Sequence, residues 1–222
     1  TGTCVDVWVG VRELPKLPER VIVEVREGMR EHPEQKTTEW VEERKKYQIH
    51  PPVHEIALID DLGRLYEGGS SNIVVHRPPE QQQPHDEGAI LRPPKGTVLE
   101  GTVLSLLEQV CASHPSSVPF LFSFFSLSEL PKWGGVGITS TSRGLLSVDE
   151  VRMTKRVAKK YGLLELVKGE VEEEEVEGEE HEDKVLLEVP RSSLLEKLSK
   201  ELNGALLASS CVPGEEKSSP KE

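Results

Sequence analysis

The chain has 222 residues, which is enough for one substantial hydrophobic core, or for one large domain with part of a second. Its formal net charge of -12 is mostly local, because ten acidic side chains and no Lys or Arg lie between Glu170 and Asp183. The rest of the chain carries a charge of only about -2, which indicates neither a nucleic-acid-binding surface nor a basic membrane patch.

The cysteines argue against two further classes of protein. Cys4, Cys111 and Cys211 are scattered and have neither CxxC nor paired-His spacing. We therefore expect no disulfide scaffold and no metal site, and a reducing, intracellular compartment that is either the cytoplasm or an organelle. The most apolar segment, Val118–Leu130, is short and interrupted by serines, so we expect no membrane span.

The first residues predict that the chain is part of a longer protein. Residue 1 is Thr, and the two methionines are Met29 and Met153. The alternating valines from Val5 to Val11 are typical of a strand already under way, and Arg12–Pro18 is a stiff connector with two prolines. Any targeting segment would lie upstream.

A second strand is predicted at Val21–Val25, followed by a helix within Gln35–Lys46. Thr37 or Thr38 can cap this helix, which places Lys36 just before its N-terminus. The N–H groups there disfavour a charged amine and would leave more free base. The alternative for Lys36 is an ordinary solvated surface lysine.

The stretch Glu67–Val75 is the most informative one in the chain. Glu55–Ile59 and Arg64–Tyr66 are predicted to form a hairpin that leads into it. Gly68 and Gly69 would take positive φ and approach a ligand, and Ser70, Ser71 and Asn72 offer short donors and acceptors before a buried strand. A poorly solvated Glu67 would need a cationic partner, such as the protonated nitrogen of a heterocycle. The alternative is a turn with no role beyond its geometry.

The next segments alternate between loops, strands and one clear helix. His76–Gly88 is polar and of low complexity, so we expect a surface loop with exposed histidines. Ala89–Leu91 resumes a strand, and Gly101–Val103 opens a helix whose apolar residues continue at helical spacing to Cys111. The free N–H groups of that helix start can bind phosphate. Phe120–Phe125 is predicted to be core.

The last third of the chain contains a second possible anion site. Gly134–Gly137 is not followed by Gly-Lys-Ser/Thr, which excludes a P-loop. The hydroxyl run Thr139–Ser142 is either an anion-binding turn or an ordinary polar turn. A basic helix is predicted at Thr154–Tyr161, a strand at Leu186–Pro190 and an amphipathic helix at Leu194–Leu202.

Four of these features follow one another in a recognisable order: a lysine, a glutamate opening Gly-Gly-Ser-Ser-Asn, a Gly-Thr-Val helix start and a Thr-Ser-Thr-Ser turn. Their order and spacing resemble the class IV (fold-type IV) pyridoxal-phosphate (PLP) enzymes, which include D-amino-acid and branched-chain aminotransferases and aminodeoxychorismate lyase. Lys36 and Glu67 are 31 positions apart, close to the separation of the Schiff-base lysine and the pyridine-nitrogen glutamate in that family.

The resemblance implies a role for each matching residue. Lys36 would form the Schiff base with PLP and move the substrate proton, and Glu67 would pair with the protonated ring nitrogen. The remaining residues implied to bind the cofactor are Ser70, Ser71, Asn72, Gly101, Thr102, Val103 and Thr141. Thr141 and Ser142 would serve the phosphate and the substrate carboxylate.

The resemblance also implies a fold and a domain organisation. The fold would be mixed α/β (α+β), a D-amino-acid aminotransferase-like large domain with a curved, barrel-like mixed sheet flanked by helices. Residues 1–20 would end an N-terminal small domain and its linker, and residues 21–207 would form the PLP-binding large domain with an acidic insertion at 170–183. Residues 208–222 would be a disordered tail. The full-length protein would be a homodimer with small-molecule substrates.

Three functions remain open at this point. The first is a PLP-dependent aminotransferase of amino-acid metabolism, acting on a branched-chain or D-amino acid and a 2-oxo acid. The second is a PLP lyase of the aminodeoxychorismate type, which releases pyruvate. The third is a catalytically silent family member that acts as an interaction protein and docks through its acidic run. If the protein is an enzyme, we expect this chain alone, without the small domain, to be weak or inactive.

Overall fold

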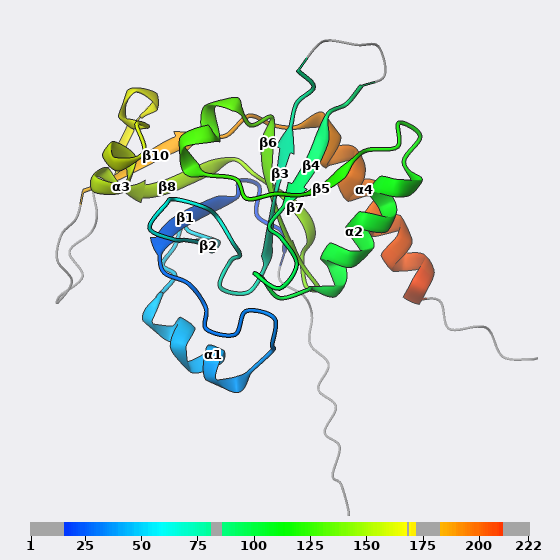
Figure 1. Cartoon of the computed structure of the whole chain (residues 1–222), viewed down its shortest axis with the longest axis horizontal. Helices are drawn as coiled ribbons and strands as arrows, with labels where there is room; N and C mark the ends of the chain where they lie inside the picture. The colour runs from blue at the N-terminus through cyan, green and yellow to red at the C-terminus, as the bar shows by residue number, and fades with distance from the viewer. Residues whose placement is uncertain (1–15, 81–85, 168, 172–182, 211–222) are drawn as a thin grey trace, which may run out of the picture.

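The computed structural model describes residues 16–80, 86–167, 169–171 and 183–210 (Figure 1). Within these ranges, ten strands form two five-stranded sheets. The strands of the first sheet are β1 (Ile22–Glu27), β2 (Glu55–Ile59), β8 (Glu150–Thr154), β9 (Gly169–Val171) and β10 (Lys184–Glu188). Their spatial order is β2-β1-β8-β10-β9, with parallel pairs around β1 and antiparallel pairs around β10.

The second sheet contains the strand that follows the Gly-Gly turn. Its strands are β3 (Asn72–Arg77), β4 (Ala89–Arg92), β5 (Phe120–Phe122), β6 (Gly135–Ser140) and β7 (Gly144–Val148). Their order is β5-β4-β3-β6-β7, and of these pairs only β4 and β5 run parallel. The hydroxyl run Thr139–Ser142 ends β6 and turns into β7, next to the start of β3, because Asn72 pairs with Thr139.

Four α-helices and three short 3-10 helices complete the described structure. The α-helices are α1 (Thr38–Glu43), α2 (Thr102–Ser113), α3 (Lys155–Lys160) and α4 (Ser193–Ser210). The 3-10 helices are η1 (Arg44–Lys46), η2 (Leu127–Lys132) and η3 (Leu164–Leu166). Figure 1 shows α2 and α4 side by side against the second sheet, α3 at the outer end of the first sheet, and α1 set apart below both.

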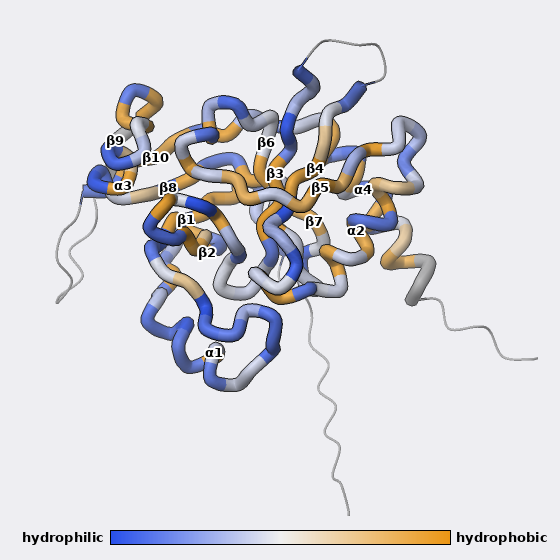
Figure 2. Tube along the Cα trace, viewed as in Figure 1, coloured by the Kyte–Doolittle hydropathy of each residue, from blue (hydrophilic) through white to orange (hydrophobic). Residues whose placement is uncertain are grey.

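Two apolar layers hold these elements together. One lies between the sheets, where Val23, Ala57 and Ile73 are buried in the same cluster. The other lies between the second sheet and the two long helices, around Leu107 and Leu198. In Figure 2 the strands are largely orange, whereas the segment around α1 is mostly blue. The elements around α1 contribute only a small apolar cluster, in which Trp40 packs with Ile56 and Leu58 of β2.

Most sequence expectations for the fold agree with the structure. The mixed α/β fold is confirmed, although in the described part the strands divide between two sheets and close no barrel. The predicted hairpin forms through an antiparallel bridge between Ile59 and Leu65. The first 15 residues and most of the acidic insertion, 172–182, lie outside the described residues. Helix α4 continues to Ser210, and so includes the first three residues of the segment predicted as a tail.

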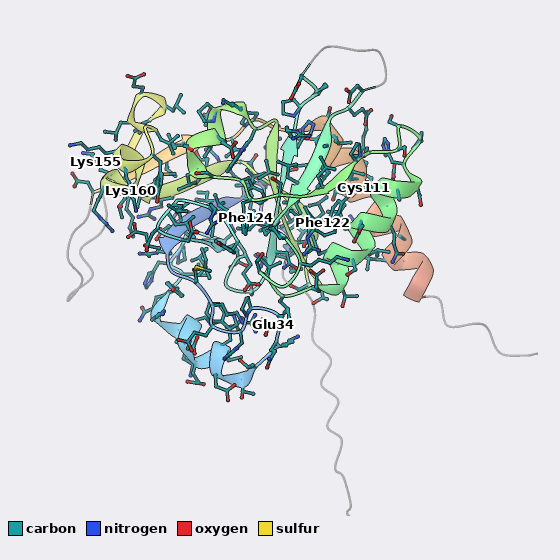
Figure 3. All side chains as sticks on the ribbon, viewed as in Figure 1. Glu34, Cys111, Phe122, Phe124, Lys155 and Lys160 are labelled. Atoms are coloured by element: carbon teal, nitrogen blue, oxygen red, sulfur yellow. The ribbon has the colours of Figure 1, made fainter. Side chains whose placement is uncertain are left out.

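One local prediction holds only in part, and another was wrong. Phe125 is core and 1% exposed, but Phe122 and Phe124, labelled in Figure 3, are 43% and 36% exposed. Phe122 lies on the short edge strand β5, and cations lie over both rings. His76 is buried in β3 rather than exposed. Its burial is possible because one ring nitrogen lies 2.8 Å from the Glu87 carbonyl oxygen and the other lies 2.9 Å from Ser192 Oγ. No helix among the described residues is long and apolar enough to cross a membrane.

Candidate functional site

A cavity of about 400 Å³ lies where four segments of the chain meet. The segments are the loop before α1 with α1 and η1, the Glu67–Asn72 turn, the loop that enters α2, and the end of β6. The lining residues are Arg30, Lys36, Thr37, Trp40, Val41, Arg44, Glu67, Gly68, Gly69, Ser70, Ser71, Asn72, Leu99, Glu100, Gly101, Thr102, Val103, Thr139, Ser140 and Thr141. They include every site residue predicted from the sequence except Ser142, which is exposed in the β6–β7 turn.

Lys36 is brought to the cavity by the way α1 is anchored. Thr37 is the N-cap residue, and its Oγ1 accepts a hydrogen bond from the Trp40 N–H at 3.4 Å. Trp40 Nε1 and Arg44 Nη1 then both donate to the Gly69 carbonyl oxygen, at 3.2 and 3.3 Å. The loop that ends in Lys36 lies beside α1, as the label of Glu34 in Figure 3 indicates. The exposed Lys36 amine is therefore held at the mouth of the cavity by contacts between α1 and the Gly-Gly turn.

The two glycines of that turn act differently from our expectation. Neither Gly68 nor Gly69 has a positive φ, so the expectation of positive φ at these two glycines was wrong. A Cβ on Gly68 would lie 2.4 Å from Ser71 Oγ and 2.9 Å from the Ile56 carbonyl oxygen. A side chain there would collide with the turn and with β2. The glycine is required for close backbone packing against β2, not for its backbone dihedrals.

Glu67 is the most perturbed acid in the cavity. The residue is 4% exposed, and its Oε2 accepts a hydrogen bond from the Leu99 N–H at 3.2 Å. Its Oε1 has no hydrogen-bond partner among the described residues, and the nearest cation is Arg30, whose Nη1 is 3.8 Å away. Burial raises the pKa of Glu67 to about 7, although the Leu99 N–H and Arg30 act in the opposite direction. A cationic ligand beside Oε1 would complete the environment of this carboxyl group.

Two hydroxyl groups of the cavity share this lack of partners. Ser71 Oγ and Thr139 Oγ1 are buried, and neither has a hydrogen-bond partner in the described part of the chain. A buried polar atom without a partner costs about 1–3 kcal/mol. With Glu67 Oε1, three such oxygen atoms belong to residues that line the cavity, and a polar ligand in the cavity could supply their partners.

The start of α2 also lines the cavity, as predicted. Gly101 is the N-cap residue of this helix and has no side-chain cap, so the first N–H groups of α2 are available to a ligand. Asn72 Nδ2 donates to the Leu99 carbonyl oxygen at 2.7 Å, and a Cβ on Gly101 would lie 2.3 Å from Asn72 Oδ1. Asn72 therefore fixes the loop that enters α2 against the start of β3.

A buried ion pair that the sequence analysis missed supports the turn. Ser70 Oγ donates to Glu55 Oε2 at 2.8 Å, and Arg143 Nη2 donates to the same carboxylate oxygen at 2.7 Å. Arg143 also donates to the His54 carbonyl oxygen and to Ser140 Oγ. These contacts join the start of β2, the Gly-Gly turn and the β6–β7 turn. The only sequence signal was an arginine directly after the hydroxyl run.

Arg30 is the other residue that the sequence did not single out. It was one of several charged residues between Arg26 and Pro33, and no pattern distinguished it from Arg26. In the structure Arg30 lines the cavity, whereas Arg26 pairs with Glu24 on β1. Within the described residues, no group of three or more His, Cys, Asp or Glu is arranged to hold a metal ion.

Comparison of the sequence with family models and with curated proteins gives no match. Comparison of the fold with solved structures does give matches. They include a branched-chain aminotransferase from Thermoproteus uzoniensis with norvaline (TM-score 0.59, 15% identity, 87% of this chain and 53% of that one). A hypothetical aminotransferase from Mycobacterium tuberculosis in its PLP-bound form also matches (TM-score 0.57, 13% identity, 86% and 56%).

A third match is a Thermotoga maritima protein assigned as a branched-chain amino acid aminotransferase (TM-score 0.56, 16% identity, 88% and 58%). Identities this low show a shared fold alone, and the fold of this chain is that of the class IV aminotransferases. The chain spans a little over half the length of these matching chains, from 53% to 58%.

Proposed function

We propose that the protein containing this chain is a PLP-dependent aminotransferase, which moves an amino group between a branched-chain or D-amino acid and a 2-oxo acid. The observation that supports it most is that one cavity is lined by an exposed lysine, a buried carboxyl group with an oxygen that has no hydrogen-bond partner in the described structure, and a helix start without a side-chain cap. The matching structures include branched-chain aminotransferases and an aminotransferase in its PLP-bound form.

The residues of the cavity fit the chemical groups of PLP. Glu67 Oε1 lacks a partner and suits a protonated ring nitrogen, because an ion pair would offset the burial of its charge. The N–H groups of Thr102 and Val103 at the start of α2 suit a phosphate, and Gly101 admits no side chain there. Ser71 and Thr139 have unused hydroxyl groups for the polar edge of the ring or the phosphate.

The residues of this chain would then have distinct tasks. When bound, PLP supplies an electron sink that makes the Cα–H bond of an amino acid acidic. Lys36 would bond the cofactor covalently through its amine and, once released, take and return the Cα proton as a base. Glu67 would hold the proton on the ring nitrogen. Thr141 would contact the phosphate, and Ser142, one residue beyond the cavity lining, would contact the substrate carboxylate.

The supporting residues would keep these groups in place. Ser70 is held by Glu55 and Arg143, and Asn72 holds the loop before α2. Because this chain covers only 53% to 58% of the matching chains, we propose that the rest of the full-length protein and a second subunit complete the substrate pocket.

The test is an absorbance spectrum of the full-length protein after addition of PLP, with Lys36→Ala beside it. A band near the visible edge that disappears on borohydride reduction, and that Lys36→Ala lacks, is the expected result. The matched control is Lys45→Ala, an exposed lysine that pairs with Glu42 on α1 and should keep the band. Mass spectrometry of the reduced protein should place the label on the peptide that contains Lys36.

Substrate assays then separate the alternatives. Amino transfer that depends on 2-oxoglutarate supports the aminotransferase, whereas pyruvate release without an amino acceptor would replace it with a lyase. A folded full-length protein with no band at any PLP concentration would overturn the enzyme proposal and favour a silent interaction protein.

A further inference from the structure

Arg30 is a buried cation at the back of the cavity. Its side chain is 3% exposed, and an arginine keeps its positive charge at any pH a protein meets. Within the described residues its ion-pair partner is Glu67, at 3.8 Å between Nη1 and Oε1. That distance is too long for a hydrogen bond, so Arg30 acts on Glu67 through charge, and Oε1 has no hydrogen-bond partner among the described residues.

Arg30 is also attached to the loop that carries Lys36. Its Nη2 donates to the carbonyl oxygen of Gln35, the residue directly before Lys36. Its guanidinium lies over the Trp40 ring, 5.3 Å from the centroid, and Trp40 in turn donates to Gly69 in the turn that follows Glu67. One side chain therefore contacts the Lys36 loop, helix α1 and the Glu67 carboxyl group.

The other charged groups near Glu67 do not duplicate this arrangement. Those that line the cavity or flank the turn are Lys36 on the same loop, Arg44 on η1, Glu55 on β2 and Glu100 before α2. Glu55 is paired with Arg143 and Glu100 with Arg92, while Arg44 donates to the Gly69 carbonyl oxygen. Among the described side chains, only Arg30 lies within ion-pair distance of Glu67.

We propose that Arg30 is a positioning residue that holds the Lys36 loop against Glu67 and keeps the Glu67 carboxyl group ionised for a cationic ligand group. The identity of that group, a protonated ring nitrogen, rests on the proposed function. The charge of Arg30 and the shape of its guanidinium group can be tested separately. A lysine at this position would keep the positive charge, but it lacks the planar group whose two nitrogens reach both Gln35 and Glu67.

The first test measures Glu67 itself, without cofactor. The full-length protein is labelled with ¹³C at the glutamate carboxyl carbons, and Glu67→Gln assigns the resonance of Glu67. Arg30→Met should raise the pKa of Glu67 above its wild-type value by about one or more, because a cation at this distance favours the carboxylate. With a rise of one, the ionised fraction at neutral pH falls from about one half to about one tenth.

Two further variants separate charge from position. Arg30→Lys should keep the titration of Glu67 near that of the wild type but still weaken PLP binding, because the contact with Gln35 is lost. Arg44→Met, which removes a different cation from the same cavity, should leave the titration of Glu67 unchanged. If Arg30→Met does not fold, Arg30→Gln and Arg30→Lys give the same comparison with less loss of packing.

The outcomes separate this inference from the proposed function. A Glu67 titration that is the same in wild type and in every folded Arg30 variant overturns the charge role, whatever PLP does. Wild-type PLP affinity in Arg30→Lys overturns the role in holding the loop. If the wild-type protein shows no PLP band but Arg30→Met raises the pKa of Glu67 as expected, the proposed function is overturned. The effect of Arg30 on Glu67 is then still supported.

Discussion

Glu67 lines the cavity, and Glu55 lies beside it. Both carboxyl groups are buried, but they differ greatly in their hydrogen-bond and ion-pair partners. Glu55 is 0% exposed and accepts hydrogen bonds from Arg143, Ser70 and the Ile56 N–H, between 2.7 and 3.1 Å. Glu67 is 4% exposed and accepts one, from the Leu99 N–H at 3.2 Å, with its cation no nearer than 3.8 Å.

This difference distinguishes a structural acid from a binding acid. Burying a carboxylate costs free energy, and close cationic partners and hydrogen bonds offset that cost. At Glu55 both oxygens have partners, so the charge stabilises the contacts between β2 and two turns. At Glu67 one oxygen has no hydrogen-bond partner in the described structure, so the fold retains an unfavourable group that a cationic ligand would stabilise.

The largest effect on stability is expected from Glu55→Ala. Removal of this carboxylate leaves the mostly buried Arg143 guanidinium and Ser70 without their partner, and the free energy of unfolding should fall by about 3 kcal/mol. Urea unfolding at neutral pH measures this decrease in the free energy of unfolding. The control is Glu42→Ala, which breaks an exposed pair with Lys45 and should cost less than about 1 kcal/mol. Equal effects of the two substitutions would mean that Glu55 is not the structural acid.

Glu67→Gln should show the opposite sign and a dependence on pH. The pKa of Glu67 is raised from 4.5 to about 7 in the folded protein, so the folded state keeps a proton that the unfolded state loses. The free energy of unfolding should therefore fall as the pH rises from 4.5 to about 7, by roughly 3 kcal/mol in total, and then stay level.

The glutamine variant lacks this titration, which gives a direct comparison. Relative to wild type, Glu67→Gln should be similarly stable near pH 4 and more stable near pH 8, by up to roughly 3 kcal/mol. Urea unfolding of both proteins across this range measures the difference. Parallel stability curves would show that Glu67 titrates alike in the folded and unfolded states, and the contrast with Glu55 would be lost.

The comparison also shows what the sequence can and cannot predict. Lys36, Glu67, Gly101 and Thr141 lie in short local patterns, and the cavity brings them together as expected. Helix α2 follows from apolar residues at helical spacing. Such signals are local, because each depends on a few neighbouring residues.

The residues that were missed depend on contacts between distant parts of the chain. Arg143 reaches Glu55 across 88 positions, and no pattern at either end indicates the other. His76 follows three apolar residues and precedes an arginine and two prolines, so the local sequence does not indicate its burial. The burial depends on contact with Ser192, which lies 116 positions away in the chain. Likewise, the need for Gly68 arises from β2 packed behind it.

A smaller effect is expected from Gly101→Ala, which tests the start of α2 in the cavity lining. The added Cβ would lie 2.3 Å from Asn72 Oδ1, so either Asn72 or the start of α2 must move, at a cost of about 1–3 kcal/mol. PLP affinity should fall as well, because the N–H groups of α2 shift. The control is Gly204→Ala in α4, where a Cβ meets nothing within 4 Å and a gain of about 0.5–1 kcal/mol is expected. A loss of stability in both variants would point to the helices rather than to the cavity.

The smallest effects are expected at two threonines, Thr139 and Thr154, which differ in their partners as the two glutamates do. Thr139 Oγ1 is buried without a partner in the described part of the chain, whereas Thr154 Oγ1 caps α3 by accepting from the Val157 N–H at 3.2 Å. Thr139→Val should therefore raise the free energy of unfolding by about 1 kcal/mol, and Thr154→Val should lower it by a similar amount. Thermal unfolding of the two variants measures whether each substitution raises or lowers stability.

If Thr139→Val lowers stability as much as Thr154→Val does, the Thr139 hydroxyl already has a hydrogen-bond partner. Its surroundings would then resemble those of Glu55. A gain in stability accompanied by weaker PLP binding would place Thr139 with Glu67, among the groups whose partner is the ligand.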